Sequence, residues 1–350
     1  MPYAYLSLDD NVDCMILDPP KMVLRTRFHL ARQQRKLRRK HLKIVVTGGS
    51  GFLGSTLAVR LLEEGHDVTC VDVNEPGAKG GLMNSARFVR GDVRDKELLR
   101  KLFDGADEIY HIAGLLGTSE LQTRITEAIE VNILSSVSVF EIATEMNVPR
   151  LFYPVKPSVW LNTYTITKAA AEQFARMFNE YGKTRICALR YFNGFGPGQA
   201  LLPIRKIIPA FAVQAMRGRP IEIFGDGDQS VDMVYSKDIA EVTIRFLRAG
   251  HTASNPDCGS GESMTVNEVA ASVNDYFGNK AGVTYLPMRA GETESTQIAS
   301  DMTELVSILG PLPITPYRTA LDETLAWYAE QDAALIDKTM KFFGWQAGSR

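Results

Sequence analysis

Short apolar runs alternate with longer amphipathic segments from Leu42 to the middle of the chain. Ile44–Val46 is the first apolar run and Phe52–Glu64 the first segment with leucines at four-residue spacing, which predicts a strand followed by a helix. The same alternation predicts further strands at Val68–Val73, Arg87–Arg90, Glu108–Ala113, Arg150–Tyr153 and Arg185–Arg190. It predicts helices around Leu98–Leu102 and over Thr123–Met146 and Tyr164–Tyr181. Strands that alternate with long helices indicate an α/β fold with a doubly wound parallel sheet of the Rossmann type.

The pattern changes after Tyr191 and predicts a second, smaller α/β region. We expect helices over Pro203–Arg217, Ser236–Ala249, Thr265–Phe277 and, as the last element, Arg318–Ala329, with strands at Ile221–Asp228 and Val283–Tyr285. The predicted organisation is an N-terminal extension (residues 1–41), a first domain (42–192, with strands contributed from about 225–260) and a C-terminal region (193–350).

The N-terminal extension differs from the rest of the chain in its charge. Residues 21–43 contain ten Lys and Arg and no acid, whereas the whole chain of 350 residues has a formal charge of −2. A weak contact with an anionic surface is one use of such a segment, and a solvated extension is the favoured alternative. Four widely spaced cysteines (Cys14, Cys70, Cys187, Cys258) without a CxxC pair argue against a metal site and disulfides. No long apolar run is present, and we expect a cytoplasmic protein.

The segment KIVVTGGSGFLG, Lys43–Gly54, joins the first strand to the first helix through three glycines, Gly48, Gly51 and Gly54. Glycine lets the backbone approach a pyrophosphate, and the N–H groups of the first helical turn, from Phe52 and Leu53 onward, point toward it. Asp72, at the end of the second strand, suits the adenine-ribose hydroxyls of NAD and would repel the 2′-phosphate of NADP. Asp92 and Val93 follow the third strand, where Asp92 either meets the adenine or forms an Asx turn.

A series of motifs extends this pattern. In order they are TGGSGFLG, Asp72, GDV (Gly91–Val93), HIAG (His111–Gly114), VNI (Val131–Ile133), YTITK (Tyr164–Lys168), RYFNGFGPGQ (Arg190–Gln199) and GDGDQSVDMVYSKDIA (Gly225–Ala240). From Leu42 to Tyr328 the chain resembles the extended short-chain dehydrogenase/reductase family of NAD-dependent nucleotide-sugar epimerases and dehydratases. The resemblance implies that residues 42–192 bind NAD, with Ala113 and Asn132 among the contacts, and that residues 193–350 mainly bind substrate. It also implies a homodimer formed through the Thr123–Met146 and Tyr164–Tyr181 helices.

Tyr164 and Lys168 are four residues apart and therefore share one face of a helix. A nearby cation lowers the pKa of a phenol, so we expect Tyr164 to be a general base near neutral pH, helped by Lys168 and the oxidised nicotinamide. In the resembling family the lysine also binds the nicotinamide ribose.

The loop before Tyr164 departs from the family pattern. It is more than ten residues shorter than usual, and PVKP, Pro154–Pro157, stands where a Ser-rich turn carries the hydroxyl that binds the reacting oxygen. Ser158, Thr163, Thr118 and the cationic Lys156 are candidates for that role, and the alternative is that no side chain takes it. Glu120 is a candidate acid–base group for an elimination, or simply the start of a helix.

The predicted substrate-binding half of the chain also departs from the family pattern. In the family the Gly225–Asp232 turn carries an arginine for the substrate diphosphate, and here that position is Val231. The resemblance assigns Asn193, Gln229 and Arg289 to the substrate, and Arg205, Lys206 or Arg217 could compensate for the missing arginine.

These features favour an NAD-dependent enzyme acting on a nucleotide-diphosphate sugar, preferentially a UDP-sugar. Our first hypothesis is a 4-epimerase: Tyr164 removes the O4 proton, NAD+ takes the C4 hydride, and the transient 4-keto sugar is reduced on its other face. A dehydratase or decarboxylase with the same 4-keto chemistry is the alternative, and a non-catalytic NAD-binding regulator is the third. We expect no nucleic-acid partner.

Overall fold

The computed structural model describes residues 41–76, 85–157, 160–293 and 297–345. The chain divides into two units, Met1–His41 and Leu42–Arg350, and the second contains the elements of the fold. The predicted basic extension, including most of residues 21–43, and Cys14 lie outside the described residues.

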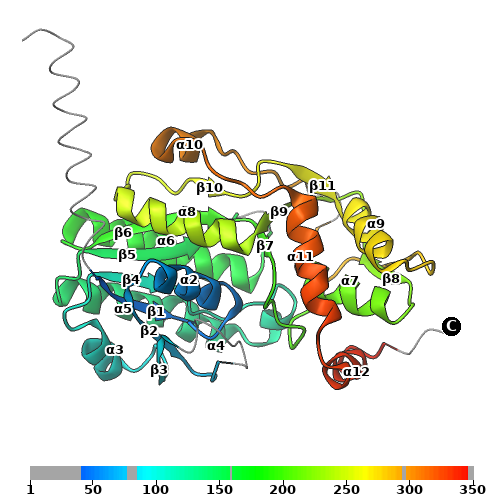
Figure 1. Ribbon diagram of the computed structural model, residues 1–350. Coiled ribbons are helices and arrows are strands. Elements are labelled where there is room, and N and C mark those ends of the chain that lie inside the picture. The colour runs from blue at the N-terminus through cyan, green and yellow to red at the C-terminus, as the bar shows by residue number, and fades with distance from the viewer. Residues whose placement is uncertain (1–40, 77–84, 158–159, 294–296, 346–350) are drawn as a thin grey trace, which may run out of the picture. The chain divides into compact units, whose positions relative to one another are not determined.

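Seven parallel strands form the central sheet (Figure 1). Their spatial order is β10 (Asp257–Cys258), β6 (Arg185–Tyr191), β5 (Arg150–Val155), β4 (Glu108–His111), β1 (Lys43–Thr47), β2 (Asp67–Asp72) and β3 (Arg87–Arg90). After β1 the chain adds β2 and β3 on one side of it, and then crosses over to add β4 on the other side. The order therefore reverses between β1 and β4, which is the topological switch point of a doubly wound sheet.

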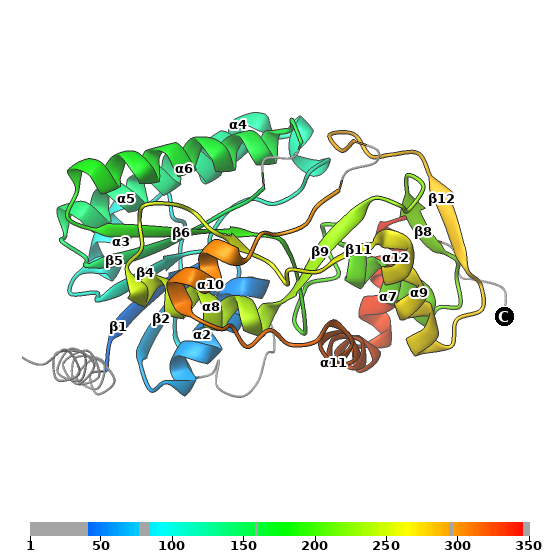
Figure 2. The ribbon, with the colours of Figure 1, turned by 90° about the horizontal axis from the view of Figure 1, so that it is seen from above.

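Helices cover both faces of this sheet (Figure 2). Alternate residues of β1 point to opposite faces: Ile44 and Val46 pack with α2 (Phe52–Glu63) and α8 (Ser236–Ala249), and Val45 packs with the opposite helices. Those opposite helices are α3 (Lys96–Phe103), α5 (Ser135–Glu145) and α6 (Thr163–Tyr181). The predicted α/β fold with a doubly wound parallel sheet is confirmed.

The C-terminal part has its own apolar core and two small sheets. One sheet has the order β11 (Ser263–Thr265), β9 (Ser230–Tyr235), β7 (Asn193–Phe195), and the other pairs β12 (Val283–Leu286) with β8 (Ile221–Phe224). The core packs β7, β8, β9 and β11 against α7 (Ile207–Met216), α9 (Val266–Phe277), α11 (Tyr317–Ala329) and α12 (Ala333–Phe342). Tyr328 of α11 is fully buried there and donates to the Gln199 carbonyl at 2.7 Å.

The predicted continuous helix Thr123–Met146 is wrong at its N-terminal half. The chain instead forms the 3-10 turn η2 (Glu120–Thr123), the short α4 (Ile125–Ala128) and the π-helical η3 (Ile129–Leu134) before α5 begins. Within η3 the Asn132 side chain turns inward and bonds the backbone of Leu115, which a regular amphipathic repeat does not reveal.

Several other boundaries were also predicted incorrectly. Arg318–Ala329 is not the last helix, because α12 follows it, and α10 (Thr303–Leu309) was not predicted. The strand from Ile221 ends at Phe224, because Gly225 and Gly227 take left-handed φ values of 79° and 81°. The strands β7, β10 and β11 have only two or three residues, too few for a periodic signal.

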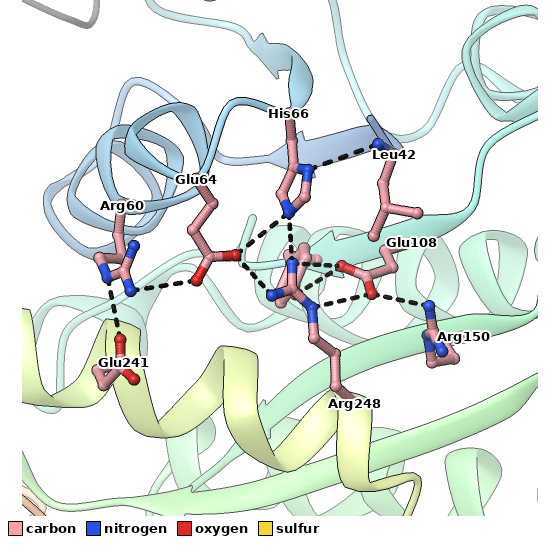
Figure 3. A network of polar contacts seen from close by, with 9 residues as sticks. Leu42, Arg60, Glu64, His66, Glu108, Arg150, Glu241 and Arg248 are labelled. Atoms are coloured by element: carbon pink, nitrogen blue, oxygen red, sulfur yellow. Dashed lines mark hydrogen bonds and ion pairs between the residues drawn. The ribbon is translucent and has the colours of Figure 1, made fainter. Parts of the chain in front are cut away.

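At the amino ends of the strands a network of charged side chains ties the sheet to its helices (Figure 3). Glu108 at the start of β4 is fully buried and lies 3.0 Å from the Arg150 guanidinium and 3.3 Å from that of Arg248 at the end of α8. Arg248 also pairs with Glu64 after α2, and the Tyr110 hydroxyl donates to Glu108 at 2.9 Å. One buried carboxylate thus joins β4, β5 and α8, at the sheet edge away from the carboxyl ends of the strands.

We expect Glu108→Gln to lower the free energy of unfolding by about 2–3 kcal/mol, because two arginines lose their buried counter-ion while the side-chain volume is kept. Urea denaturation measures this change. The matched control is Glu141→Gln, which removes the exposed pair with Lys96 and should cost less than about 0.5 kcal/mol. Equal costs for the two variants would contradict a stabilising role for the buried network.

Candidate active site

The carboxyl ends of the parallel strands form one wall of a large pocket of about 680 Å³. Residues that follow β1, β2, β3, β4, β5 and β6 all line it, and the switch point lies between β1 and β4. Residues of α7, β8, β9 and the segment 288–293 form the opposite wall. A ligand in this pocket therefore touches both halves of the described structure.

The glycine turn after β1 is built for a close approach of backbone to ligand. Gly48 has φ of +71°, and a Cβ there would lie 2.7 Å from the backbone nitrogen of Ala113, two residues after β4. A Cβ on Gly54 would lie 2.1 Å from the Gly48 carbonyl oxygen, so only glycine lets α2 begin against this turn. Gly51 is the N-cap of α2, and Phe52 and Leu53 begin the helix at the pocket wall. This cradle fits the pyrophosphate of a dinucleotide.

Two carboxylates border the turn. Asp72 at the end of β2 accepts from the backbone N–H of Ser50 at 3.1 Å and of Asn74 at 3.0 Å, which holds its carboxylate at the pocket. Asp92 also lines the pocket, beside Val93, and accepts from the Arg94 backbone N–H at 2.9 Å in an Asx turn. The Arg94 guanidinium lowers the pKa of Asp92 through a charged hydrogen bond. Asp72 thus presents its carboxylate to the pocket, and the Asx-turn alternative for Asp92 is observed.

Tyr164 and Lys168 both lie on α6 and line the pocket. The Lys168 ammonium is buried and lies 3.8 Å from the centroid of the Tyr153 ring on β5. Burial lowers the pKa of Lys168 to about 7, which Glu172 partly opposes, and burial raises the pKa of Tyr164 to about 12. The expected lowering of the Tyr164 pKa by Lys168 is therefore wrong for the protein groups alone, because desolvation of the phenol dominates.

Lys156 is the first residue after β5 and also lines the pocket. Its ammonium lies 5.7 Å from the Tyr164 ring centroid and donates to the Thr165 hydroxyl at 2.9 Å and the Pro157 carbonyl at 2.7 Å. Burial, followed by the positive charge of Lys206, lowers the pKa of Lys156 to about 8. Of the other candidates for the missing hydroxyl, Thr118 lines the pocket, Thr163 bonds Gln122 at 3.2 Å, and Ser158 lies outside the described residues.

The opposite wall carries the residues expected to meet substrate. Asn193, Gln229 and Arg289 all line the pocket, and so does Val231, which provides apolar surface in place of a guanidinium. Asp232, next to Val231, is fully buried and holds the backbone of Ser260 at 2.7 Å, a structural role.

Arg205 and Arg289 stack near one aromatic ring. Their guanidinium carbons lie 4.5 and 5.1 Å from the Phe224 ring centroid, and each is held by a carboxylate, Arg205 by Glu222 at 3.0 Å and Arg289 by Glu292. Planar guanidinium groups fixed in this way suit a diphosphate. Arg217, by contrast, is not a lining residue and pairs with Asp337 at 2.6 Å.

One pocket brings together nearly all the predicted residues. Asn132 is not a lining residue: it is buried and supports the Leu115 loop and Thr167 of α6. Glu120 lines the pocket and also begins η2, as its alternative interpretation stated. Sequence reasoning missed Phe224, Glu222 and Glu292; only the three-residue spacing of Arg289 and Glu292 could have indicated one of these ion pairs.

Residues 44–258 match the model of the NAD dependent epimerase/dehydratase family. The chain belongs to that family. It is 26% identical over 270 residues to a putative UDP-glucose 4-epimerase of Methanocaldococcus jannaschii, covering 71% of this chain and 87% of the relative. It is 25% identical to a UDP-N-acetyl-alpha-D-glucosaminuronate decarboxylase of Bacillus cytotoxicus, covering 82% of this chain and 98% of the relative. An epimerase structure from Methanothermobacter thermautotrophicus has a TM-score of 0.79 and 27% identity, and the match covers 85% of this chain and 95% of that one.

Membership confirms the predicted family, the enzyme class and NAD as the cofactor. The glycine cradle would hold the NAD pyrophosphate, Asp72 the adenine ribose, and Tyr164 with Lys168 the nicotinamide end. The described residues contain no cluster of His, Cys, Asp and Glu that could hold a metal ion. In the described part of the chain, no helix is both long and apolar enough to cross a membrane.

We expect Lys168→Met to abolish activity and to raise the free energy of unfolding at neutral pH by about 1 kcal/mol, because a buried ammonium is removed. An unfolded lysine keeps its proton up to a pKa of 10.5, whereas the folded Lys168 loses it at about 7. Wild-type stability from this group therefore rises with pH between these values, and the advantage of the variant should shrink over the same range.

Urea denaturation across that pH range tests this expectation. The control is Lys183→Met, which removes an exposed lysine and should show no such pH dependence. A variant less stable than wild type throughout would contradict the burial cost assigned to Lys168.

Proposed function

We propose that this protein is an NAD-dependent nucleotide-sugar 4-epimerase that acts through a transient 4-keto sugar, with a UDP-sugar as the favoured substrate. The observation that carries the proposal is the position of Tyr164 and Lys168, which line the one pocket that both the glycine cradle and the Arg205–Arg289 wall share. The similarity to a putative UDP-glucose 4-epimerase and to a UDP-N-acetyl-alpha-D-glucosaminuronate decarboxylase supports the substrate class.

Tyr164 is the proposed general base and acid. Its phenol takes the O4 proton as C4 is oxidised and returns it as C4 is reduced on the other face. Since burial raises its pKa to about 12, the phenolate needs positive charge beside it. Lys168 and Lys156 supply that charge from the chain. Bound NAD+ would accept the hydride from C4 and would add a further positive charge.

The substrate wall holds the nucleotide diphosphate. Arg289 and Arg205 are the proposed bidentate groups, so that Arg205 replaces the arginine absent at Val231, and Asn193 and Gln229 are proposed donors. Trp160, Thr118 and Lys156 border the sugar end. In this arrangement the sugar ring lies between Tyr164 and the two arginines, Arg205 and Arg289, that hold the diphosphate.

A dehydratase or decarboxylase is the second candidate. Glu120 lines the pocket near Thr118, and a carboxylate there can act on C5 of a 4-keto sugar. The similarity to a uronate decarboxylase favours this alternative, whereas the shortened connection from Val155 to Thr163 removes the usual place for an elimination dyad. A cytoplasmic location remains a prediction; the three described cysteines are buried and free.

The decisive experiment incubates the NAD-loaded protein with UDP-, GDP- and dTDP-sugars in deuterated water and follows the products by NMR. Inversion at C4 without deuterium at C5 supports the epimerase. Deuterium at C5 or C6, or release of CO2, replaces it with the second candidate. If no sugar nucleotide binds or reacts, the enzyme proposal is refuted.

We expect Tyr164→Phe to lower kcat by about 10²–10⁴-fold, because proton transfer at O4 loses its positioned group. Binding of NAD and UDP-sugar should persist, since the phenyl ring keeps its packing. Calorimetry and steady-state kinetics on the same preparation separate the two effects. A variant that retains wild-type kcat would remove Tyr164 from the chemistry.

We also propose a homodimer. The segments α4, η3 and α6 pack together and expose a common set of apolar side chains: Ile125, Ile129, Leu134, Ile166, Phe174 and Met177. An apolar helical face of this kind fits the self-complementary interface of a symmetric dimer.

We expect Phe174→Glu combined with Met177→Glu to convert a wild-type dimer into a monomer, because two charges would be buried at the interface. Sedimentation velocity at micromolar concentration measures this change. The matched control is Val306→Glu, an equally exposed apolar position on α10 outside the patch, which should stay dimeric. A monomeric wild type, or a dimer that survives the double substitution, would be evidence against this interface.

A further inference from the structure

Two lysines from different halves of the structure line the pocket without a carboxylate partner. Lys156 follows β5, and Lys206 is the residue before α7. Within the described residues, neither ammonium lies within 4.0 Å of an Asp or Glu oxygen, whereas the neighbouring Arg205 and Arg289 are both ion-paired. Lys156 is held by two neutral oxygens, from Thr165 and Pro157.

The positive charge of Lys206 disfavours the charged form of Lys156. Lys206 lowers the pKa of Lys156, and burial lowers the pKa of both. Other charged groups that act on the pair are Glu120 of η2, Arg289 and Glu292. Two like charges that share a partly buried pocket are costly unless an anion joins them, and Glu120, held outside ion-pair distance, does not neutralise both.

The place of the pair indicates which part of a ligand would carry that anion. Lys156 lies beside the Tyr164 ring, where the reacting sugar hydroxyl must sit, while Arg205 and Arg289 flank Phe224 on the diphosphate wall. The diphosphate therefore has its own cations. Apart from the Tyr164 phenolate, an anion that meets Lys156 therefore belongs to the sugar ring.

We propose that the sugar end of this pocket binds a carboxylate through Lys156 and Lys206, so that the substrate is a nucleoside-diphosphate uronic acid rather than a neutral hexose. This inference rests on the proposed function and adds the charge of the sugar to it. Lys156 and Lys206 then act as specificity residues that recognise a group two or more bonds from the reacting carbon.

UDP-glucuronic acid and UDP-glucose are the probes, since they differ only at C6. Calorimetry and kinetics on the NAD-loaded full chain should give at least about tenfold tighter binding and higher kcat/KM for the uronic acid, as expected for a charged hydrogen bond that only one ligand can make. We expect this preference whether C4 inverts or CO2 is released.

The lysine variants test whether these two residues carry the preference. Lys206→Met and Lys156→Met should each reduce the ratio of uronate to glucose affinity toward one. The exposed-lysine control Lys183→Met should keep the wild-type ratio. Because binding and thermal unfolding are read on the same samples, a variant that fails to fold is recognised, and Lys206→Gln then replaces it.

The outcomes separate this inference from the proposed function. If UDP-glucose reacts and UDP-glucuronic acid does not bind better, the enzyme proposal stands and the carboxylate site is wrong. The inference also fails if the preference exists but survives both lysine substitutions. If neither nucleotide sugar binds or reacts, the proposed function and this inference fall together.

Discussion

The structure depends on the contact of α2 with the turn that ends β1. Gly54 approaches the Gly48 carbonyl so closely that a single Cβ would overlap it, and Gly48 in turn lies against the backbone of Ala113. These approaches bring the ends of β1 and β4 together at the point where the strand order reverses. A helix N-terminus and two strand ends then face one space, and this geometry gives the pocket an anion-binding end.

At the amino ends of the strands, by contrast, the buried charges are paired. There the Glu108 carboxylate contacts the guanidinium groups of Arg150 and Arg248 and the hydroxyl of Tyr110. The buried negative charge is therefore neutralised by two positive ones. In the pocket, by contrast, burial is the main influence on Lys168, Lys156 and Lys206 and lowers the pKa of each. Uncompensated charge costs stability in the free protein and becomes useful when an anionic ligand or a phenolate is present.

The pocket explains the two positions, Lys156 and Val231, at which the sequence departs from the family pattern. Lys156 occupies the turn where a hydroxyl is usual, and it places a cation beside Tyr164. Val231 removes a guanidinium from β9, and Arg205 lies across Phe224 from Arg289 on the same wall. Positive charge has therefore not been lost from the pocket but is distributed differently along it.

The sequence by itself determined the α/β class, most of the central strands, the glycine turn, Asp72 and the Tyr164–Lys168 pair. These features depend on short-range periodicity or on fixed spacing along one strand or helix, which the local sequence contains. Only the tertiary structure decided that Thr123–Met146 is interrupted, because Asn132 bonds Leu115 across a turn. It also decided the pKa direction of Tyr164 and the placement of Lys156 and Lys206 in one pocket. Desolvation and the distance between residues fifty positions apart arise from packing, and no local pattern encodes them.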